Sequence, residues 1–396
     1  MTLTNSQEPD FYDILLLSYL YKYRALSLEM CWFTSYRSVC SDFSDCFKSR
    51  LLPLIQQGLI AYRPDVKYKY IALLTPKGQD LLRHSQNLPR YTEEQHRTLL
   101  KPSELLITES QIPHQVSLSD FLIRFSDEYR KRGYSEELLV FSETAVEKYD
   151  YMRPDGMLVL PTKKIFVEQD MGTESKFMLT SKWNRYRRYL SSIKNEMTSP
   201  ITVPFIIDTN PGSFDTRCDV VRRTAISTFF HMLDRQIEVY IGNEEELLNT
   251  TLNITIKDHF NEETHRKSLF NYFSSECYKV KDGNEIRNYT GDTLFDWFIQ
   301  RTVNGKVAKR TTENGSVIPD MFVVDSYEGF PISVIAKAMF IERTQSRFRA
   351  NYPQIKNLPY LITGGSLEKL RHDLESVGFE NNGFVFYLLG EKIVSV

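Results

Sequence analysis

Cysteine is scarce in this sequence of 396 residues, and no two cysteines are spaced as Cys-x-x-Cys. The five cysteines are Cys31, Cys40, Cys46, Cys218 and Cys277. A zinc site of the ribbon or finger type therefore has no ligand pattern to build on. An odd number of scattered cysteines also argues against a disulfide framework and favours a reducing compartment. We therefore expect a cytoplasmic protein.

Long apolar runs and several catalytic motifs are also missing. The stretch ILLLSYL near the N-terminus is too short and too interrupted for a membrane span or a signal peptide, so no membrane association is expected. No GxxxxGK[ST] loop is present, which argues against ATP hydrolysis. The seven histidines include no His-hydrophobic-His pair, and this sets aside relaxases that rely on that motif.

An excess of positive charge is absent as well. Lysine and arginine number 49 against 51 acidic residues, for a net charge of -2. Any nucleic-acid contact must therefore come from local basic faces. With 41% hydrophobic and 25% charged residues the chain is typical of a globular protein, and its length predicts two or three domains.

Residues 11–82 show three helical patterns followed by a hairpin. DFYDILLLSYLYKYRAL has apolar residues at helical spacing, SLEMCWFTSY begins with a serine cap, and SDFSDCFKSRLLPLIQQGLI ends at a glycine. AYRPDVKYKYIALL then alternates like two strands around a Pro64-Asp65 turn, before a last helix at Thr75-Pro76. This order is typical of a winged helix-turn-helix, which we assign to residues 1–95.

In a winged helix the third helix enters the major groove and the wing contacts phosphate. Asp42 and Asp45 at the start of that helix would cap it but repel phosphate, and Pro53 is expected to kink it. A protein-binding or dimerising winged helix therefore remains an alternative to double-stranded DNA binding. The candidate DNA contacts are Ser44, Lys48, Arg50, Arg63, Lys67 and Lys69.

Residues 116–242 show a different pattern of predicted secondary structure, in the order helix, three strands, helix, strand, helix, strand. The segments are SLSDFLIRFSDEYRKRG, ELLVFSETA, DGMLVL, KKIFVEQD, SKFMLTSKWNRYRRYLSSI, ITVPFIIDT, DTRCDVVRRTAISTFFHMLDR and IEVYIG. This order predicts a mixed sheet covered by helices, and it is also the order of the PD-(D/E)XK nuclease core. We assign this domain to residues 96–242.

The remaining third, residues 243–396, is predicted to repeat the second. DTLFDWFIQRTVNG would match the leading helix, SVIPDMFVVD the acid-bearing strand, and FPISVIAKAMF the strand after it. In this alignment Pro319-Asp320 is kept, while Ile335 and Lys337 replace Glu168 and Asp170. We therefore expect an α+β protein with a winged helix and two tandem PD-(D/E)XK-like units. The second unit would be degenerate, serving as a structural element, binding platform or dimer surface.

Three acids of the first nuclease-like domain, residues 96–242, form a candidate metal site. Asp155 precedes one strand, and Glu168 and Asp170 lie on the next at a spacing that places both on one face. Converging carboxylates repel each other unless a cation offsets their charge. Asp155, Glu168 and Asp170 are therefore the predicted ligands of Mg²⁺ or Mn²⁺ and the predicted catalytic acids. In the alternative interpretation, Asp155 caps a turn and the other two acids bind arginines of the following helix.

The lysine that usually follows these acids is missing, because Asp170 occupies its place. Lys176 or Lys182 could substitute for it from the following segment. Lys182, Arg185, Tyr186 and Tyr189 are spaced by three or four residues, so one helical stripe is predicted to present them together. Arg185 and Tyr186 are accordingly further candidate DNA contacts.

These motifs together resemble the replication-relaxation proteins of plasmids and integrative elements. The resemblance rests on LTPKGQDLL, IPHQVSLSDFLIRF with His114, RPDG, VEQDMGTES and the spaced Lys182 and Tyr186, and covers about residues 11–210. It implies a winged helix joined to a PD-(D/E)XK-like domain, and a role in plasmid replication, DNA relaxation or conjugative transfer. It places Asp155, Glu168, Asp170 and Lys182 at the presumed catalytic site.

Three functions follow as hypotheses. The first is a DNA-binding protein of a mobile element that works with other replication or transfer proteins of that element, as a homo-oligomer. The second is an active metal-dependent endonuclease of transposon-end, nicking or defence type. The third is a non-enzymatic assembly or regulatory protein.

Overall fold

We describe the fold from a computed structural model. It describes residues 8–86, 105–134, 138–142, 152–161, 163–194, 197, 199–233, 236–257, 278–282, 297–303, 306–307, 310–311, 317–318, 321–327, 329–351, 360–364, 366–379, 385–389 and 392–395. Among these residues, every helix is too short or too polar to cross a membrane. The contacts divide the chain into two compact units, Met1–Met171 and Gly172–Val396.

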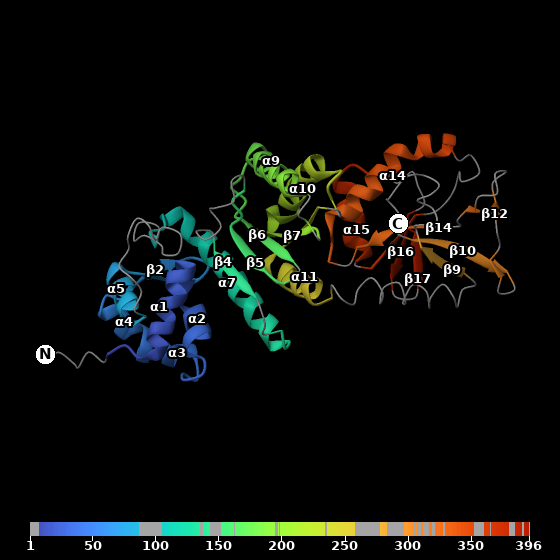
Figure 1. The fold of residues 1–396 in the computed structure, drawn as a ribbon. Coiled ribbons are helices and arrows are strands. Elements are labelled where there is room, and N and C mark those ends of the chain that lie inside the picture. Colours follow the sequence, from blue (N-terminus) through green and yellow to red (C-terminus); the bar gives the residue numbers. More distant parts are fainter. Residues whose placement is uncertain are drawn as a thin grey trace. The chain divides into compact units, whose positions relative to one another are not determined.

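The first unit begins with the predicted helices (Figure 1). Helix α1 (Phe11–Tyr23) starts at a capping box, because the Asp10 carboxylate accepts hydrogen bonds from the backbone of Tyr12 and Asp13. Helix α2 (Leu28–Cys31) is capped by Ser27 and continues as a π-helical turn, Trp32–Tyr36. The third helical segment joins α3 (Phe43–Cys46), a π-helical turn (Phe47–Leu51) and α4 (Leu52–Gln56).

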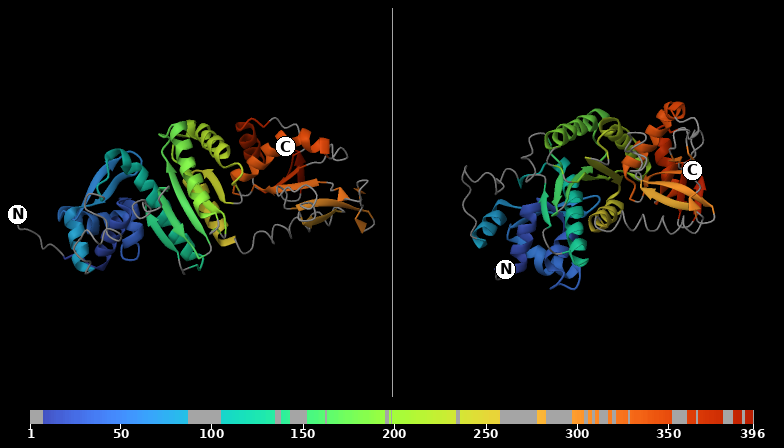
Figure 2. Two further views of the ribbon diagram at one scale, coloured as in Figure 1. Left: turned by 45° about the horizontal axis from the view of Figure 1, so that its top comes forward. Right: turned by 45° about the vertical axis from the view of Figure 1, so that its right-hand side comes forward.

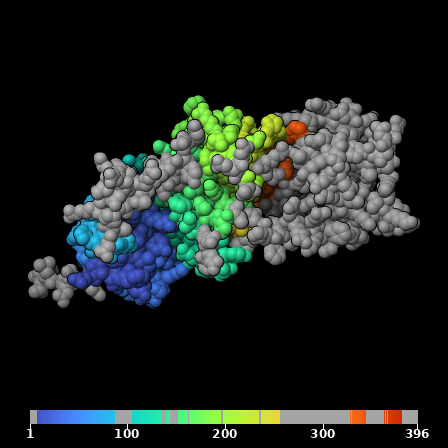
Figure 3. Space-filling view, in the orientation of Figure 1, coloured from blue at the N-terminus to red at the C-terminus, as the bar shows by residue number. Residues whose placement is uncertain are grey.

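Pro53 explains why this third segment changes its hydrogen bonding. Proline lacks the N–H that an α-helix would use, and here it lies in the first turn of α4, directly after the π-helical turn. At Pro53, where the sequence predicted a kink, the hydrogen bonding changes from π-helical back to α-helical within one continuous helical segment. Several leucines of these helices are fully buried, namely Leu16, Leu17, Leu20 and Leu51, and Figure 3 draws this region in blue.

A three-stranded sheet follows the helices. Its order is β1 (Ala25–Ser27), β3 (Lys69–Leu74), β2 (Ile60–Asp65), and all pairs are antiparallel. Strands β2 and β3 form the predicted hairpin, and α5 (Pro76–Ser85) begins at Thr75, whose hydroxyl accepts from the Gly78 N–H. Ala25 and Ile71 on one face of the sheet pack against Ile112 and Val116 of α7 (Ile112–Lys131).

The next sheet has the strand order β4-β5-β6-β7-β8. In the first unit β4 (Leu139–Ser142), β5 (Gly156–Val159) and β6 (Lys164–Asp170) are antiparallel. In the second unit β7 (Ile201–Ile207) and β8 (Ile237–Gly242) are parallel. Helices α9 (Lys176–Ile193) and α10 (Pro211–Phe229) lie on one side of β7 and β8, and α11 (Glu244–Lys257) lies on the other (Figure 2).

The C-terminal part of the second unit contains its own sheet. The strand order is β11-β10-β14-β15-β16-β17, with β9 paired to β10. Strands β14 (Met321–Ser326), β15 (Tyr360–Thr363) and β16 (Val385–Leu389) are parallel and are connected by α14 (Ile332–Asn351) and α15 (Leu367–Ser376). The other strands are β9 (Tyr278–Asp282), β10 (Trp297–Val303), β11 (Lys306–Val307) and β17 (Lys392–Ser395), while β12 (Arg310–Thr311) and β13 (Val317–Ile318) pair separately.

The structure corrects two elements of the predicted repeat. Residues 297–303, expected within a helix, form strand β10, and the FPISVIAKAMF segment, expected as a strand, begins helix α14. Ile335 and Lys337 therefore lie on a helix, and their proposed equivalence to Glu168 and Asp170 is wrong. An apolar run such as this one fits a buried strand or a buried helix equally well, and here Val334 and Ile335 are buried on the helix. The Pro319-Asp320 pair lies outside the described residues.

The mixed α+β class is confirmed. The helices and strands predicted between residues 11 and 242 are present, and the order β14-α14-β15-α15-β16 repeats the strand-helix alternation of β6-α9-β7-α10-β8. The predicted domain boundaries near residues 95 and 242 stay a prediction.

Candidate nucleic-acid interface and carboxylate site

The third helical segment presents two of the predicted DNA contacts. Ser44 and Lys48 are both exposed, and their spacing of four residues places them on one side of the helix. Asp42 is the N-cap, and its carboxylate accepts the Asp45 N–H at 2.9 Å. The acids therefore stabilise the start of this segment, as expected.

Arg50 lies in the same segment but is engaged elsewhere. Its Nη1 atom is 2.7 Å from Asp10 Oδ2 and 3.8 Å from Asp13 Oδ2 at the start of α1. Its side chain is 22% exposed, and its guanidinium also lies over the Tyr36 ring. Arg50 thus joins two helices, which makes it a poor candidate for DNA contact.

The hairpin carries the other three predicted contacts. Arg63, Lys67 and Lys69 are all exposed. Arg63 forms an ion pair of 3.0 Å with Glu109, whose side chain is 89% exposed. Pairs this exposed contribute little stability, so a phosphate can replace the carboxylate at small cost.

Two hairpin tyrosines are exposed that the sequence prediction passed over. Tyr62 is 46% and Tyr70 45% exposed, and their ring centroids are 5.7 Å apart in an edge-on arrangement. Val66 at the hairpin turn is fully exposed. The alternation of β2 and β3 contained this signal, since tyrosines on the solvent face of a hairpin stand out from the usual polar residues.

Asp155 precedes β5 and is held in place by two groups of the first unit. Its Oδ2 atom accepts the backbone N–H of Gln169 on β6 at 2.8 Å and lies 3.3 Å from Nε2 of His114 on α7. The next residue, Gly156, lets α7 approach β5, because an added Cβ would come within 3.1 Å of Leu122. The RPDG motif thus combines a positioned carboxylate with a close helix–strand contact, and His114 is a site neighbour to which the sequence gave no role.

Glu168 and Asp170 on β6 are almost fully buried, at 0% and 1% exposure. Gln169 between them points to the other face of the strand. Among the described residues, however, no three His, Cys, Asp or Glu side chains are arranged to hold a metal ion. Mg²⁺ is commonly held by one or two carboxylates together with water, so Asp155, Glu168 and Asp170 are the residues that would hold it here.

Lys182 belongs to the second unit and lies on the buried face of α9. Its Nζ atom is 3.0 Å from Glu174 Oε1 and 5.5 Å from the centre of the Phe205 ring. The Glu174 backbone carbonyl accepts a hydrogen bond of 2.6 Å from Arg217 on α10. Gly172, two residues before Glu174, has a φ of +75°, and a Cβ there would lie 2.5 Å from Thr209. This turn requires glycine, and it sets the position of the acid that binds Lys182.

The predicted stripe on α9 is divided between two faces. Lys182, Tyr186 and Tyr189 are buried, and Tyr186 is only 1% exposed and packs against Trp183. Tyr186 therefore has almost no surface through which to contact DNA from this position. Arg185 is exposed, as are Arg187 and Arg188, which the prediction did not include.

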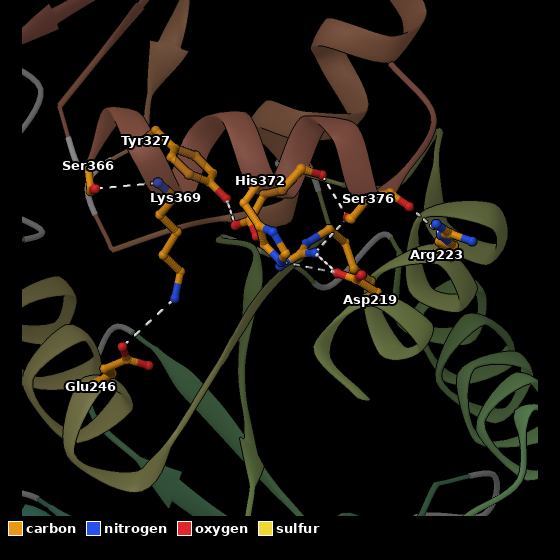
Figure 4. Close-up of polar contacts among 10 residues, drawn as sticks. Asp219, Arg223, Glu246, Tyr327, Ser366, Lys369, His372 and Ser376 are labelled. Atoms are coloured by element: carbon orange, nitrogen blue, oxygen red, sulfur yellow. Dashed lines mark hydrogen bonds and ion pairs between the residues drawn. The ribbon is translucent and has the colours of Figure 1, made fainter. Parts of the chain in front are cut away.

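A buried polar network connects α10 to α15 within the second unit (Figure 4). Arg222 Nη2 donates to Asp373 at 2.6 Å, and its Nη1 donates to Asp219 and to the Ser376 hydroxyl at 2.8 Å each. Tyr327 also donates to Asp373. Burial, followed by the neighbouring Asp373 carboxylate, raises the pKa of Tyr327 well above its usual value.

A pocket of about 330 Å³ lies beside this network. Lys369 and His372 of α15, both drawn in Figure 4, line the pocket, and Lys369 lies 4.4 Å from the Phe330 ring centre. Ser366 caps α15, because its hydroxyl accepts the backbone N–H of Lys369. The acids Asp215, Glu368 and Asp373 also line the pocket, so its walls show no clear preference for an anion.

Comparisons with known proteins identify one family. Comparison with curated proteins and with solved structures gave no significant match. The family model described as Replication-relaxation matches residues 36–203, a range that contains the hairpin, Asp155, Glu168 and Lys182. This family suggests a role in the replication or relaxation of mobile elements. The resemblance to the replication-relaxation family, inferred from the motifs, is thereby confirmed over these residues.

Proposed function

We propose that this protein binds double-stranded DNA of a mobile genetic element through a winged helix formed by α1–α4 and the β2–β3 hairpin. The observation that carries the proposal is the set of exposed basic side chains on the third helical segment and the hairpin, within the range that matches the family. In a winged helix, these two elements are the ones that contact the groove and the phosphates. The cellular process would be plasmid replication, relaxation or conjugative transfer, together with partner proteins of the same element.

The charge distribution supports local rather than global attraction. The whole chain carries a net charge of -2, so binding depends on a few cations placed together. Lys48, Lys67 and Lys69 are exposed, and Arg63 has an easily replaced partner. Each phosphate neutralised by such a side chain contributes about 0.9 to the slope of log affinity against log salt concentration.

The salt dependence of binding provides the test. Binding of the full-length protein to a duplex from its own element is measured by fluorescence anisotropy across a salt series. The variant carries Lys48→Ala, Lys67→Ala and Lys69→Ala together. We expect weaker binding and a salt slope smaller by about two to three units.

The matched control is Lys131→Ala. Lys131 is exposed and paired with Asp127 and Glu128 on α7, away from the hairpin and the third helical segment in the sequence. Its removal should change neither affinity nor slope. Absence of DNA binding by the wild type, or an unchanged slope in the triple variant, contradicts the proposal. The first result would favour the assembly or regulatory function.

A second candidate function is metal-dependent DNA cleavage. The observation in its favour is that the Asp155 carboxylate accepts a hydrogen bond from the backbone of Gln169. Gln169 is the residue of β6 that lies between Glu168 and Asp170. Among the described residues no group of three such side chains is arranged to hold a metal ion, so a bound metal would rely on fewer protein ligands completed by water. We therefore rank cleavage below binding, with Lys182 retained as its candidate lysine.

Cleavage is tested with supercoiled plasmid that carries the element, incubated with Mg²⁺ or Mn²⁺. The comparison is the wild type against Asp155→Ala/Glu168→Ala. Conversion to open-circle or linear DNA by the wild type alone would establish a nuclease. No conversion, with DNA binding intact in both proteins, would leave binding as the function.

A further inference from the structure

The exposed tyrosines of the hairpin share one face of it. In the register of β2 and β3, Tyr62 lies opposite Ala72, and Pro64 lies opposite Tyr70. Side chains of directly paired residues project to the same face, so Tyr62 and Tyr70 are diagonal neighbours. The small Ala72 opposite Tyr62 leaves the tyrosine ring without a large cross-strand partner on that side.

The third tyrosine of the hairpin behaves differently. Tyr68 is half-buried and packs against the cluster formed by Ala25, Ile71, Ile112 and Val116. Burial raises its pKa to about 12. Tyr68 thus anchors the hairpin to α7, whereas Tyr62 and Tyr70 remain about half exposed. Tyr62 and Tyr70 are therefore exposed because of the hairpin face on which they lie. The hairpin itself is packed against α7 through Tyr68.

Positive charge lies on the other face of the same hairpin and in its turn. Arg63 and Lys69 project from the opposite face of the same hairpin, and Lys67 lies in its turn. The one acid of the hairpin, Asp65, accepts backbone hydrogen bonds from Lys67 and Tyr68 at 2.8 and 2.9 Å, so its carboxylate stabilises the turn. Three cations against one acid make the hairpin locally basic.

We propose that Tyr62 and Tyr70 bind unpaired DNA bases by stacking. Lys67 in the turn, and Arg63 and Lys69 on the other face, would hold phosphates farther along the strand as it passes around the hairpin. Aromatic rings beside a basic surface are the arrangement that binds single-stranded nucleic acid, because every base offers a π-face. Bases inside a duplex are already stacked on each other and offer no such face. An apolar protein partner would explain the rings but not the cations of the same hairpin.

This inference rests on the proposed DNA binding and narrows its target to DNA with locally unpaired bases. Such DNA arises wherever strands are separated or nicked. The winged helix would then hold the duplex, and the hairpin would hold the opened segment next to it.

The test compares three DNAs: a duplex, the same duplex with a short central bubble, and the corresponding single strand. One unpaired base of the bubble is replaced by 2-aminopurine, whose fluorescence falls on stacking with tyrosine. The variants are Tyr62→Ala/Tyr70→Ala and Tyr62→Phe/Tyr70→Phe. The control is Phe11→Ala, which removes a ring of 72% exposure from α1.

The wild type should prefer the bubble to the duplex, should also bind the single strand, and should quench the 2-aminopurine. The alanine variant should lose about tenfold or more in affinity for both unpaired DNAs and should lose the quenching. Its duplex binding should be retained. The phenylalanine variant should behave as the wild type because its rings can still stack, and Phe11→Ala should have no effect.

Several results would overturn the inference while leaving DNA binding intact. These are equal affinity of the wild type for bubble and duplex, an equal loss for both DNAs in the alanine variant, or an unchanged affinity in that variant. If the alanine variant kept its DNA affinity but lost self-association in sedimentation, the rings would bind a second copy of the chain instead. Absence of all DNA binding would overturn the proposed function together with this inference.

Discussion

Replacing Asp373 with alanine should destabilise the second unit by about 3 kcal/mol, because it breaks a buried charge pair. The side chains of Arg222 and Asp373 are only 4% and 3% exposed, and their atoms are 2.6 Å apart. Removing one partner of a buried pair typically costs about 3–5 kcal/mol, since the other charge is left without compensation. The lower end applies because Arg222 keeps Asp219, at 2.8 Å, and the Ser376 hydroxyl.

Tyr327 adds to this loss. Its hydroxyl donates to Asp373 and is buried, so the variant leaves a donor without its acceptor. A buried donor without a partner costs about 1–3 kcal/mol. The destabilisation by Asp373→Ala therefore stays near about 3 kcal/mol even if Arg222 recovers part of the stability that it loses with Asp373. The pair Tyr327→Phe and Asp373→Ala, made singly and together, separates the two contributions.

Urea unfolding, together with hydrogen exchange of α10 and α15, measures the effect region by region. Hydrogen exchange is needed because a chain with several domains does not unfold in one transition. Protection should fall in α10 and α15 and stay unchanged in α1. The control Asp219→Ala should cost less, because Asp219 is 23% exposed. A loss below about 1 kcal/mol in Asp373→Ala would refute the assignment of a stabilising buried pair.

Two further predictions concern the first unit. Arg50→Ala should lower its stability by about 1–2 kcal/mol, through loss of the Asp10 contact, and leave DNA affinity unchanged; unfolding and anisotropy measured together check this. The contribution of Tyr68 to stability should be constant below about pH 10 and fall between pH 10 and about 12, because a tyrosine that ionises near 10 when unfolded has its pKa raised to about 12 at Tyr68 by burial. Urea unfolding as a function of pH should show a smaller decline in Tyr68→Phe, and an equal decline would contradict the assignment.

The sequence predicted helices and strands correctly where residues close together in the chain determine them. The apolar spacing of the first helix, the caps at Ser27 and Asp42 and the alternation of the hairpin predicted elements that the structure contains. It was insufficient for β10 and α14, because an apolar run of moderate length fits either type of element when both faces are buried.

The candidate site was predictable in residue type but not in exposure. Lys48 and Arg50 are two residues apart and look equivalent, yet the partner of Arg50 is forty positions away in the sequence. On α9, helical spacing grouped Lys182 with Arg185 as readily as with Tyr186. Only the packing of Trp183 and Phe205 shows that Lys182 and Tyr186 belong to the buried face.

The contacts of α10 and β8 indicate that residues 258–396 are needed for the stability of the elements before them. Arg222 of α10 is bound by Asp373 and Ser376, and Glu238 of β8 accepts the Ser333 N–H at 3.2 Å. A fragment ending at Lys257 would lose all of these partners and would leave two charged side chains in an incomplete interface. We therefore expect this fragment to unfold at a lower temperature than the full-length protein, or to aggregate. Adding the change Arg222→Met to the fragment should recover part of the loss, because it removes the guanidinium that had lost its carboxylate. Equal protection of α10 from hydrogen exchange in the fragment and the full-length chain would show that α10 does not depend on the C-terminal part.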